Sequence, residues 1–243
     1  MWEKLCDSFC KPGRVVLHVT SEEEGKESLH RIKRASSVVI QNGIDLPHLN
    51  DSIEPTRDRP VRLLYIGRLH PIKGLENLLQ GLVQLKSQVR LSICGEGNAD
   101  YEARLHSVVA QLGLNQYVKF HGRVDGEAKE KQFRDADLCI VPSFKESFCT
   151  VIVESLARAV PVIASQGTPW RRLEEVGCGL WVNNDPKELS KAISQATHMP
   201  LLEMGLRGRA WMEREYSWSS VATKMVALYR SMIVDGELNK SEQ

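Results

Sequence analysis

From residue 61 onward, the sequence alternates short apolar runs with segments whose apolar residues recur at helical spacing. The apolar runs predict strands at 61–66, 89–94, 117–121, 138–141, 161–164 and 179–182. The other segments predict helices at 74–86, 98–112, 126–135, 148–158, 186–196, 200–214 and 218–232. Strands that alternate with helices form a parallel sheet that helices cover on both faces. We therefore expect an α/β fold with a doubly wound parallel sheet.

The chain before residue 61 predicts a much smaller α/β piece. It has two strands, at 15–19 and 38–40, and a helix that starts with a capping box at Ser21 and Glu24 and runs to about Arg34. The proline-rich, charged segment that follows predicts a linker. The sequence thus divides into residues 1–45, a linker at 46–60, a main domain at 61–215, and a last helix with a tail at 216–243.

Composition excludes several classes of protein. A net charge of +1 gives no reason to expect a nucleic acid partner, and no apolar run approaches the roughly 18 residues of a membrane span. The six cysteines include no C-x-x-C pair, so we expect free thiols in a reducing cytoplasm rather than disulfides or zinc. No His, Asp or Glu cluster has metal-ligand spacing, and we expect no bound metal.

The stretch from Asp137 to Glu154 predicts a strand, a turn and a helix, with Ser147 as the helix N-cap. The free N–H groups of a helix start and its partial positive charge favour an anion. Glu146 lies just before the helix, and Glu154 lies about two turns into it, roughly 10 Å along the axis. An anion between two carboxylates predicts a ligand with a diphosphate centre and hydroxyls at both ends.

Other polar residues follow neighbouring strands and should lie at the same carboxyl edge of the sheet. Gly67 lets the backbone turn closely after its strand, and the planar fork of Arg68 suits phosphate oxygens. Lys73 adds a point charge near the next helix start. The pair Gly95 and Gly97 lacks the third glycine of a dinucleotide fingerprint. The two glycines are therefore as well explained by a tight turn after the strand as by contact with a ligand.

The spacing Glu146-x7-Glu154 resembles the E-x7-E motif of retaining glycosyltransferases with the GT-B fold, family 4 (group 1). Residues 61–74 resemble the family's strand with its Gly-Arg-Leu and Lys-Gly signature. Three further segments also match, at 42–45, 94–97 and 120–123, in the family's order. The resemblance spans roughly residues 15–233. It implies the Rossmann-like, donor-binding C-terminal domain of that fold, with residues 1–45 as a remnant of the N-terminal acceptor domain.

The resemblance also implies roles for the matching residues. Arg68 and Lys73 would hold the donor diphosphate and offset its charge as it leaves, and Glu146 would contact sugar hydroxyls; these three are the expected catalytic residues. Glu154 would bind ribose hydroxyls, and Arg123 would reach the base or its pocket. The expected donor site comprises Gly67, Arg68, Lys73, Gly95, Arg123, Glu146, Phe148, Cys149, Thr150 and Glu154, with the backbone N–H groups of residues 148–150 on phosphate.

The expected reaction is transfer of a hexosyl group from a UDP-, GDP- or ADP-sugar to a glycan or lipid-linked acceptor, as in the synthesis of cell-envelope polysaccharides. It needs no cofactor, and it would take place in the cytoplasm or at the inner face of the membrane. Two alternatives stay open: a nucleotide-sugar-binding module that is inactive without a partner chain, and a nucleotide-sugar epimerase, for which the sequence offers no acid/base set. The remnant and the last helix predict self-association or binding of a chain that supplies an N-terminal half.

Two tryptophan-containing segments match the family less specifically. Residues 168–182 resemble a segment of polysaccharide-synthesising members, and Trp170 within it either lines the cleft or packs in the core. His121 is expected to be packed or solvent-facing rather than catalytic. Residues 216–218, Tyr-Ser-Trp, resemble a structural feature that precedes the family's last helix.

Overall fold

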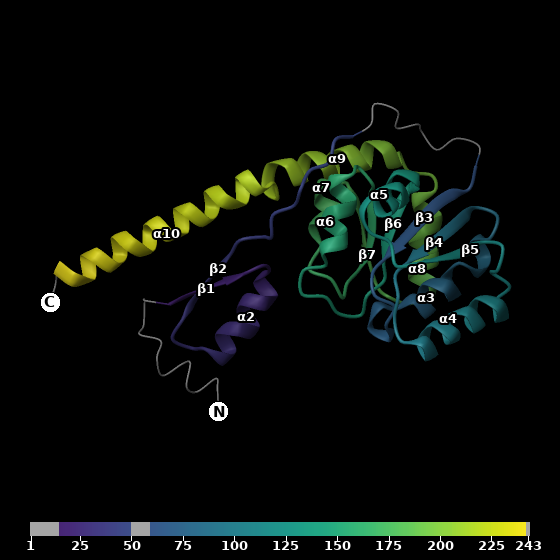
Figure 1. The fold of residues 1–243 in the computed structure, drawn as a ribbon, viewed down its shortest axis with the longest axis horizontal. Helices are drawn as coiled ribbons and strands as arrows, with labels where there is room; N and C mark the ends of the chain where they lie inside the picture. The colour runs from purple at the N-terminus through teal and green to yellow at the C-terminus, as the bar shows by residue number, and fades with distance from the viewer. Residues whose placement is uncertain (1–14, 50–58, 242–243) are drawn as a thin grey trace. The chain divides into compact units, whose positions relative to one another are not determined.

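A computed structural model of the chain describes residues 15–49 and 59–241, which form two compact units (Figure 1). The larger unit lies within residues 46–213, and the smaller one combines residues up to 45 with residues from 214 onward. Most of the predicted linker, residues 50–58, lies outside the described residues. The four-part division of the sequence therefore stays a prediction.

Among the described residues, the sheet of the larger unit has six parallel strands in the order β5-β4-β3-β6-β7-β8. They are β3 (Val61–Ile66), β4 (Val89–Cys94), β5 (Val118–Gly122), β6 (Leu138–Val141), β7 (Val162–Ser165) and β8 (Gly179–Val182). This is the strand order of a doubly wound Rossmann sheet. The order reverses between β3 and β6, where such sheets bind their ligands.

Helices cover both faces of this sheet (Figure 1). Leu63 and Tyr65 of β3 join a core with residues of α3, α4 and α8, whereas Leu64, on the other face of the same strand, packs with Phe133 of α5. The helices are α3 (Leu75–Gly81), α4 (Ala99–Gln111), α5 (Gly126–Asp135), α6 (Thr150–Ala157), α7 (Arg172–Val176), α8 (Pro186–Ala196) and α9 (Leu201–Glu215). The predicted doubly wound α/β fold is confirmed.

Three short elements differ from the predicted helices. The helix predicted at 74–86 divides into α3 and the 3-10 helix η2 (Val83–Leu85). The N–H of Leu82 is shared between the carbonyls of Leu78 and Leu79, at 3.1 and 3.2 Å, so the helix tightens there. The 3-10 helix η1 (Pro71–Lys73) and α7 were not predicted, because three to five residues are too few to show a helical period.

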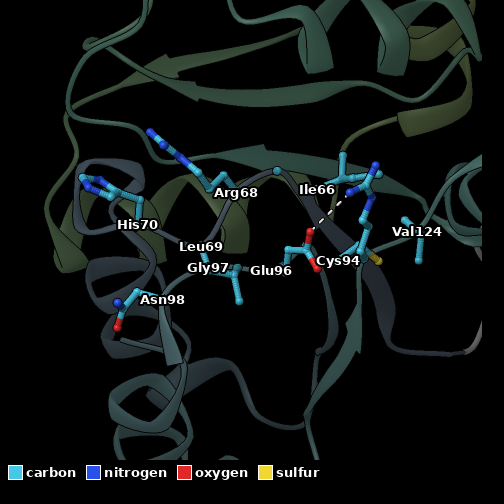
Figure 2. A pocket seen from close by; sticks show the side chains of 12 residues that line it. Ile66, Arg68, Leu69, His70, Cys94, Glu96, Gly97, Asn98 and Val124 are labelled. Atoms are coloured by element: carbon cyan, nitrogen blue, oxygen red, sulfur yellow. Dashed lines mark hydrogen bonds and ion pairs between the residues drawn. The ribbon is translucent and has the colours of Figure 1, made fainter. Parts of the chain in front are cut away.

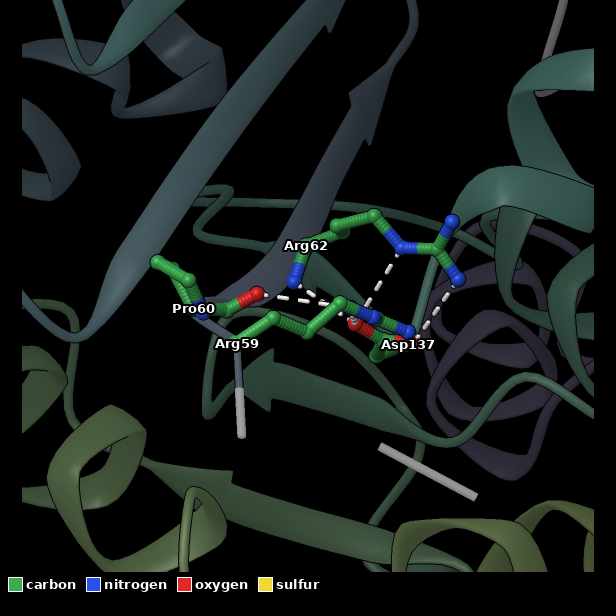
Figure 3. A network of polar contacts seen from close by, with 4 residues as sticks. All are labelled: Arg59, Pro60, Arg62 and Asp137. Carbon is green, nitrogen blue, oxygen red and sulfur yellow. Dashed lines mark hydrogen bonds and ion pairs between the residues drawn. The ribbon is translucent and has the colours of Figure 1, made fainter. Parts of the chain in front are cut away.

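A buried carboxylate joins the amino ends of β3 and β6, at the edge opposite the expected ligand site (Figure 3). Both oxygens of Asp137 accept from the Arg59 guanidinium, at 2.6 and 2.9 Å. Asp137 also accepts from the Arg62 backbone N–H at 2.8 Å and from its Nη2 at 3.1 Å. Burial raises the pKa of Asp137, but the hydrogen bonds from Arg59 and Arg62 outweigh it, so the net pKa lies below its usual value.

The smaller unit contains a parallel pair of strands, β1 (Val16–Val19) and β2 (Ser36–Val39), and helix α2 (Glu22–Arg31). Ser21 caps α2 as predicted, since its hydroxyl accepts from the Glu24 N–H at 3.2 Å. The Glu24 carboxylate accepts from the backbone N–H of Thr20 at 2.7 Å. A capping box would instead use the N–H of Ser21, one residue later. α2 also ends three residues earlier than predicted.

Two segments singled out in the sequence meet within this smaller unit. The N–H of Ile44 donates to the carbonyl of Tyr216 at 2.9 Å, and Trp218 Nε1 donates to Asp45 Oδ1 at 2.9 Å. Helix α10 (Trp218–Ser241) starts at this junction and is longer than the predicted 218–232. The contacts fix the start of α10 against the segment that follows β2.

Candidate functional site

The expected site residues do follow strands at one edge of the sheet, on both sides of the reversal point. Gly67 and Arg68 come directly after β3, and residues 142–149 connect β6 to α6. β3 and β6 are neighbours, pairing Leu63 with Leu138. The edge where they end is where a doubly wound sheet opens a crevice.

A cavity of about 650 Å³ lies at the carboxyl ends of β3, β4 and β5 (Figure 2). Its walls are the segments that follow these strands, which contribute Ile66, Gly67, Arg68, Leu69, His70, Cys94, Gly95, Glu96, Gly97, Asn98, Arg123 and Val124. The volume suits a small ligand. Four of the predicted donor-site residues, Gly67, Arg68, Gly95 and Arg123, therefore lie around one space.

Close backbone approach explains the glycine at position 95. The Gly67 N–H donates to the Cys94 carbonyl at 2.9 Å, and the Gly95 N–H donates to the Gly122 carbonyl at 2.7 Å. A Cβ on Gly95 would lie 1.8 Å from the carbonyl oxygen of Gly67, so no larger residue fits. The three post-strand segments are thus held together by their backbones, and this close packing accounts for the Gly-x-Gly pattern.

The charges of the cavity are mostly exposed. Arg123 Nη1 lies 3.4 Å from Glu96 Oε1, and both side chains are largely in solvent. The Arg68 side chain is also exposed and points away from Glu96 (Figure 2). Among the described residues no carboxylate pairs with Arg68, so its guanidinium is available to a bound anion.

Lys73 and Glu146, 73 positions apart in sequence, form an ion pair with Nζ and Oε1 separated by 2.5 Å. The Ser143 hydroxyl donates to the same oxygen at 2.7 Å. The two charged side chains are only 22% and 13% exposed, so solvent screens them weakly. The second oxygen, Oε2, has no hydrogen-bond partner within the described ranges and can accept from a hydroxyl.

The segment between β3 and α3 joins this ion pair to the cavity. Arg68 and Lys73 lie at its two ends, and the Tyr65 hydroxyl fixes its start by donating to the Arg68 carbonyl at 2.9 Å. Its far end touches the β6–α6 connection, where the Phe144 N–H donates to the Ile72 carbonyl at 2.8 Å. The expected catalytic residues therefore lie on two connected loops.

The prediction that Ser147 caps the helix after β6 is wrong. Helix α6 begins at Thr150, and its N-cap is Cys149, whose side chain makes no capping hydrogen bond. Cys149 has a left-handed backbone with φ of 66°, a conformation that costs a non-glycine residue about 1–2 kcal/mol. This turn, rather than a serine hydroxyl, leads the chain into α6. The first N–H groups of a helix have no partner within it, so an anion can bind them.

Glu154 lies on α6, outside the residues that line the cavity. Its Oε1 is 2.7 Å from Nζ of Lys129, which belongs to α5. Both side chains are partly exposed. The ion pair fixes the direction of this carboxylate.

The thiols of the site are protonated at neutral pH. Cys94 lines the cavity, and burial raises its pKa to about 11. Burial and the nearby Glu146 carboxylate also raise the pKa of Cys149. Neither sulfur is a candidate nucleophile. The described cysteines, including Cys139 and Cys178, are free.

His121 is partly buried and lies away from the cavity at the carboxyl ends of β3, β4 and β5. Its Nε2 lies 3.2 Å from the Ser92 hydroxyl, and its side chain does not line the cavity. Burial lowers the pKa of His121, and the charge of Lys119 lowers it further.

In the described ranges, no three His, Cys, Asp or Glu side chains gather as they would around a metal ion. No helix in these ranges is long and apolar enough to cross a bilayer.

Two supporting contacts were not predicted from the sequence. Ser143 donates to Glu146, and only its place three residues earlier in the same loop hinted at this contact. Trp170, whose role was left open, is 3% exposed and packs in the core, and its indole N–H donates to the carbonyl of Phe148. No local sequence pattern connects Trp170 with Phe148, since they lie on different loops.

Comparison with known proteins supports the resemblance. The sequence profile of the family described as "Glycosyl transferases group 1" matches residues 50–210, well over half of the chain. A phosphatidyl-myo-inositol mannosyltransferase of Mycobacterium leprae is 31% identical over 215 residues, which cover 83% of this chain and 55% of that protein. The chain spans about half the length of the relatives that it matches.

Two solved structures have the same fold. A sucrose-phosphate synthase from Thermosynechococcus elongatus matches with a TM-score of 0.76 and 25% identity, covering 96% of this chain and 62% of that one. The Anabaena protein Alr3699/HepE, solved in complex with UDP, matches with a TM-score of 0.74 and 21% identity, covering 89% and 64%. The fold is therefore that of GT-B glycosyltransferases.

Proposed function

This chain belongs to the group 1 glycosyl transferases, and we propose that it binds the nucleotide-sugar donor of a retaining hexosyl transfer at the carboxyl edge of β3 and β6. The observation that supports the proposal is the Lys73–Glu146 ion pair, which joins the segment after β3 that carries Arg68 to the connection that leads from β6 into α6. Two cationic side chains and a helix start suit a diphosphate. A carboxylate beside them suits the hydroxyls of a sugar.

In this scheme each side chain has a separate role. Arg68 binds the diphosphate, and Lys73 offsets the negative charge that grows on it as the bond to the sugar breaks. Glu146, held by Lys73 and Ser143 through Oε1, accepts from a sugar hydroxyl through Oε2 and so orients the sugar. The diphosphate leaves from the face on which the acceptor attacks, which retains the configuration of the sugar.

The nucleoside end of the donor is proposed to lie toward the cavity and α6. Glu154, fixed by Lys129, accepts from ribose hydroxyls, and Arg123 borders the base pocket together with Gly95. The backbone N–H groups of Phe148, Cys149 and Thr150 bind phosphate. No metal ion is needed in this scheme, because cationic side chains and helix N–H groups supply the countercharge.

The acceptor is proposed to be a glycan or a lipid-linked glycan, as for family 4 enzymes of cell-envelope synthesis. The name of the Mycobacterium leprae relative, a phosphatidyl-myo-inositol mannosyltransferase, supports a lipid-linked acceptor and a hexosyl group. The site of action would be the cytoplasm or the inner face of the membrane. In this scheme residues 1–45 belong to the acceptor domain of the GT-B fold.

The alternative is a binding module that holds the donor and needs a partner chain for transfer. Incubating the purified chain with UDP-, GDP- and ADP-hexoses and a panel of lipid-linked glycans distinguishes the two. Transfer of labelled hexose supports the enzyme, whereas donor binding without transfer supports the module. If neither occurs, both proposals fail.

A further inference from the structure

Trp170 reaches from one loop into the turn that begins α6. It lies between β7 and α7, and its indole Nε1 donates to the carbonyl of Phe148. Phe148 directly precedes Cys149, the left-handed N-cap. The indole therefore contacts the same peptide group that carries the Cys149 N–H.

The indole ring is held in place on two sides. The ring of Phe148 lies 5.6 Å away between centroids, and the ring of Trp211 lies 5.7 Å away in an edge-on arrangement. The guanidinium of Arg172 sits 5.0 Å from the Trp211 ring centre. Such aromatic packing fixes the direction of the Nε1–H bond.

The loop that carries Trp170 also holds the β6–α6 connection at two other backbone points. The Gly167 carbonyl accepts from the Glu146 N–H at 2.8 Å, and the Ser165 hydroxyl donates to the Ser143 carbonyl. A Cβ on Gly167 would lie 2.3 Å from the Phe144 carbonyl oxygen, so the loops pack backbone to backbone. The segment that follows β7 thus contacts the β6–α6 connection at several points along its backbone.

A trans peptide points its C=O and N–H in opposite directions. The Ser143–Phe144 peptide shows the consequence, because its carbonyl faces Ser165 while its N–H donates to the Ile72 carbonyl at 2.8 Å on the other side. By the same geometry, a Phe148 carbonyl held by Trp170 directs the Cys149 N–H away from Trp170.

We infer that Trp170 is a positioning residue of the donor site: it holds the Phe148–Cys149 peptide so that the Cys149 N–H points at the donor's phosphate. The inference rests on the proposed function, because it presupposes a diphosphate at the start of α6. Without the indole donor, the strained left-handed Cys149 can relax and turn its N–H away from the ligand. Trp170 itself does not touch the ligand.

The test uses Trp170→Phe, which keeps an aromatic ring and removes the N–H donor. UDP and uridine are titrated by NMR into the full chain. The Kd of UDP is expected to rise about tenfold, the size of a lost hydrogen bond to a charged group, while the Kd of uridine changes less than twofold. Trp181→Phe is the matched control, since its indole donates to the Thr168 carbonyl of the same loop at 3.0 Å, outside the turn. It should leave UDP binding unchanged.

Equal weakening of UDP and uridine, or equal effects of the two variants, would contradict positioning and indicate a general loss of structure. An unchanged UDP affinity in Trp170→Phe would overturn the inference and leave the donor site standing. If the unaltered chain binds no UDP, GDP or ADP, the proposed function itself fails. Should Trp170→Phe not fold, β-(3-benzothienyl)alanine at position 170 keeps the indole shape without its N–H, and the same outcomes apply.

Discussion

At the scale of single residues, the proposed site has two kinds of side chain. One kind would bind the diphosphate, which every nucleoside diphosphate and nucleotide sugar contains, and the other would bind only the sugar. Arg68 is an exposed guanidinium beside the cavity, with no carboxylate paired to it in the described ranges. Glu146 is a half-buried carboxylate with one oxygen engaged and one open. Substitutions at these two positions should therefore change different affinities.

Arg68→Ala should weaken bare nucleoside diphosphates and nucleotide sugars alike. A charge-assisted hydrogen bond contributes about 1.5–3 kcal/mol, which corresponds to a loss of tenfold or more in affinity. Calorimetry with a nucleotide and its matching sugar nucleotide measures both losses. Arg90→Ala, which removes the same charge at the amino end of β4, is the control and should have no effect on either ligand. A selective loss of the sugar nucleotide would contradict the assigned role.

Glu146→Ala should weaken the nucleotide sugar about tenfold and leave the bare nucleoside diphosphate nearly unchanged. The carboxylate meets only the sugar in the proposed complex, and Lys73 still carries its charge after the ion pair is lost. The same pair of titrations measures the ratio of the two affinities. Equal losses for both ligands would rule out a contact between Glu146 and the sugar.

At the scale of the elements, the apolar runs were enough to predict the positions of the strands. The strands of the larger unit lie within one residue of their predicted positions, because buried parallel strands are continuous apolar runs. The start of α6 was not predictable in the same way. The turn before Cys149 contacts a loop about twenty residues further along the chain: Trp170 donates to the Phe148 carbonyl, and Gly167 packs against Phe144.

The ion pair at the site was likewise only half predictable. The sequence marked Lys73 and Glu146 as separate candidates, but nothing in it indicated that they touch. Their contact follows from the strand order, which brings the end of β3 next to the end of β6. A sequence pattern records spacing along the chain, whereas this contact crosses the reversal point of the sheet.

The Asp137 carboxylate should stabilise the larger unit in a pH-dependent way. Its pKa in the folded chain is lowered, so its stabilisation is present above the unfolded pKa of about 4 and is lost as pH falls through the folded pKa. Asp137→Asn should lower the free energy of unfolding by about 1–3 kcal/mol at pH 7, since both arginines are partly exposed. The difference from the unaltered chain should shrink below about pH 4.

Urea unfolding at pH 7 and at pH 3 measures this difference. Asp135→Asn is the matched control, because its ion pair with Lys131 is about half exposed on both sides and should contribute less than about 0.5 kcal/mol. Equal effects of the two substitutions at pH 7 would show that the buried network does not stabilise the junction of β3 and β6.

At the scale of the whole molecule, helix α10 carries large apolar side chains that remain in solvent. Val226, Tyr229 and Ile233 are 46%, 56% and 61% exposed, and their spacing of three and four residues places them on one face of the helix. Contiguous exposed apolar side chains favour association. The predicted binding of a second copy or of another chain would use this face.

Replacing Val226, Tyr229 and Ile233 together by serine should convert an associating chain to a monomer. Light scattering coupled to size exclusion measures the mass of both forms. Leu206→Ser is the control, because Leu206 is a similarly exposed apolar residue, at 45%, on α9. A monodisperse monomer before any substitution would contradict the prediction of self-association.

We propose that the carboxyl edge of β3 and β6 binds the diphosphate of a nucleotide sugar through side chains and helix N–H groups. Calorimetric titration of the full chain with UDP, GDP and ADP, in the presence and absence of a chelator, tests it most directly. At least one nucleotide should bind, with the same affinity under both conditions. Absence of binding by all three would contradict the site, and loss of binding with the chelator would contradict its independence of metal.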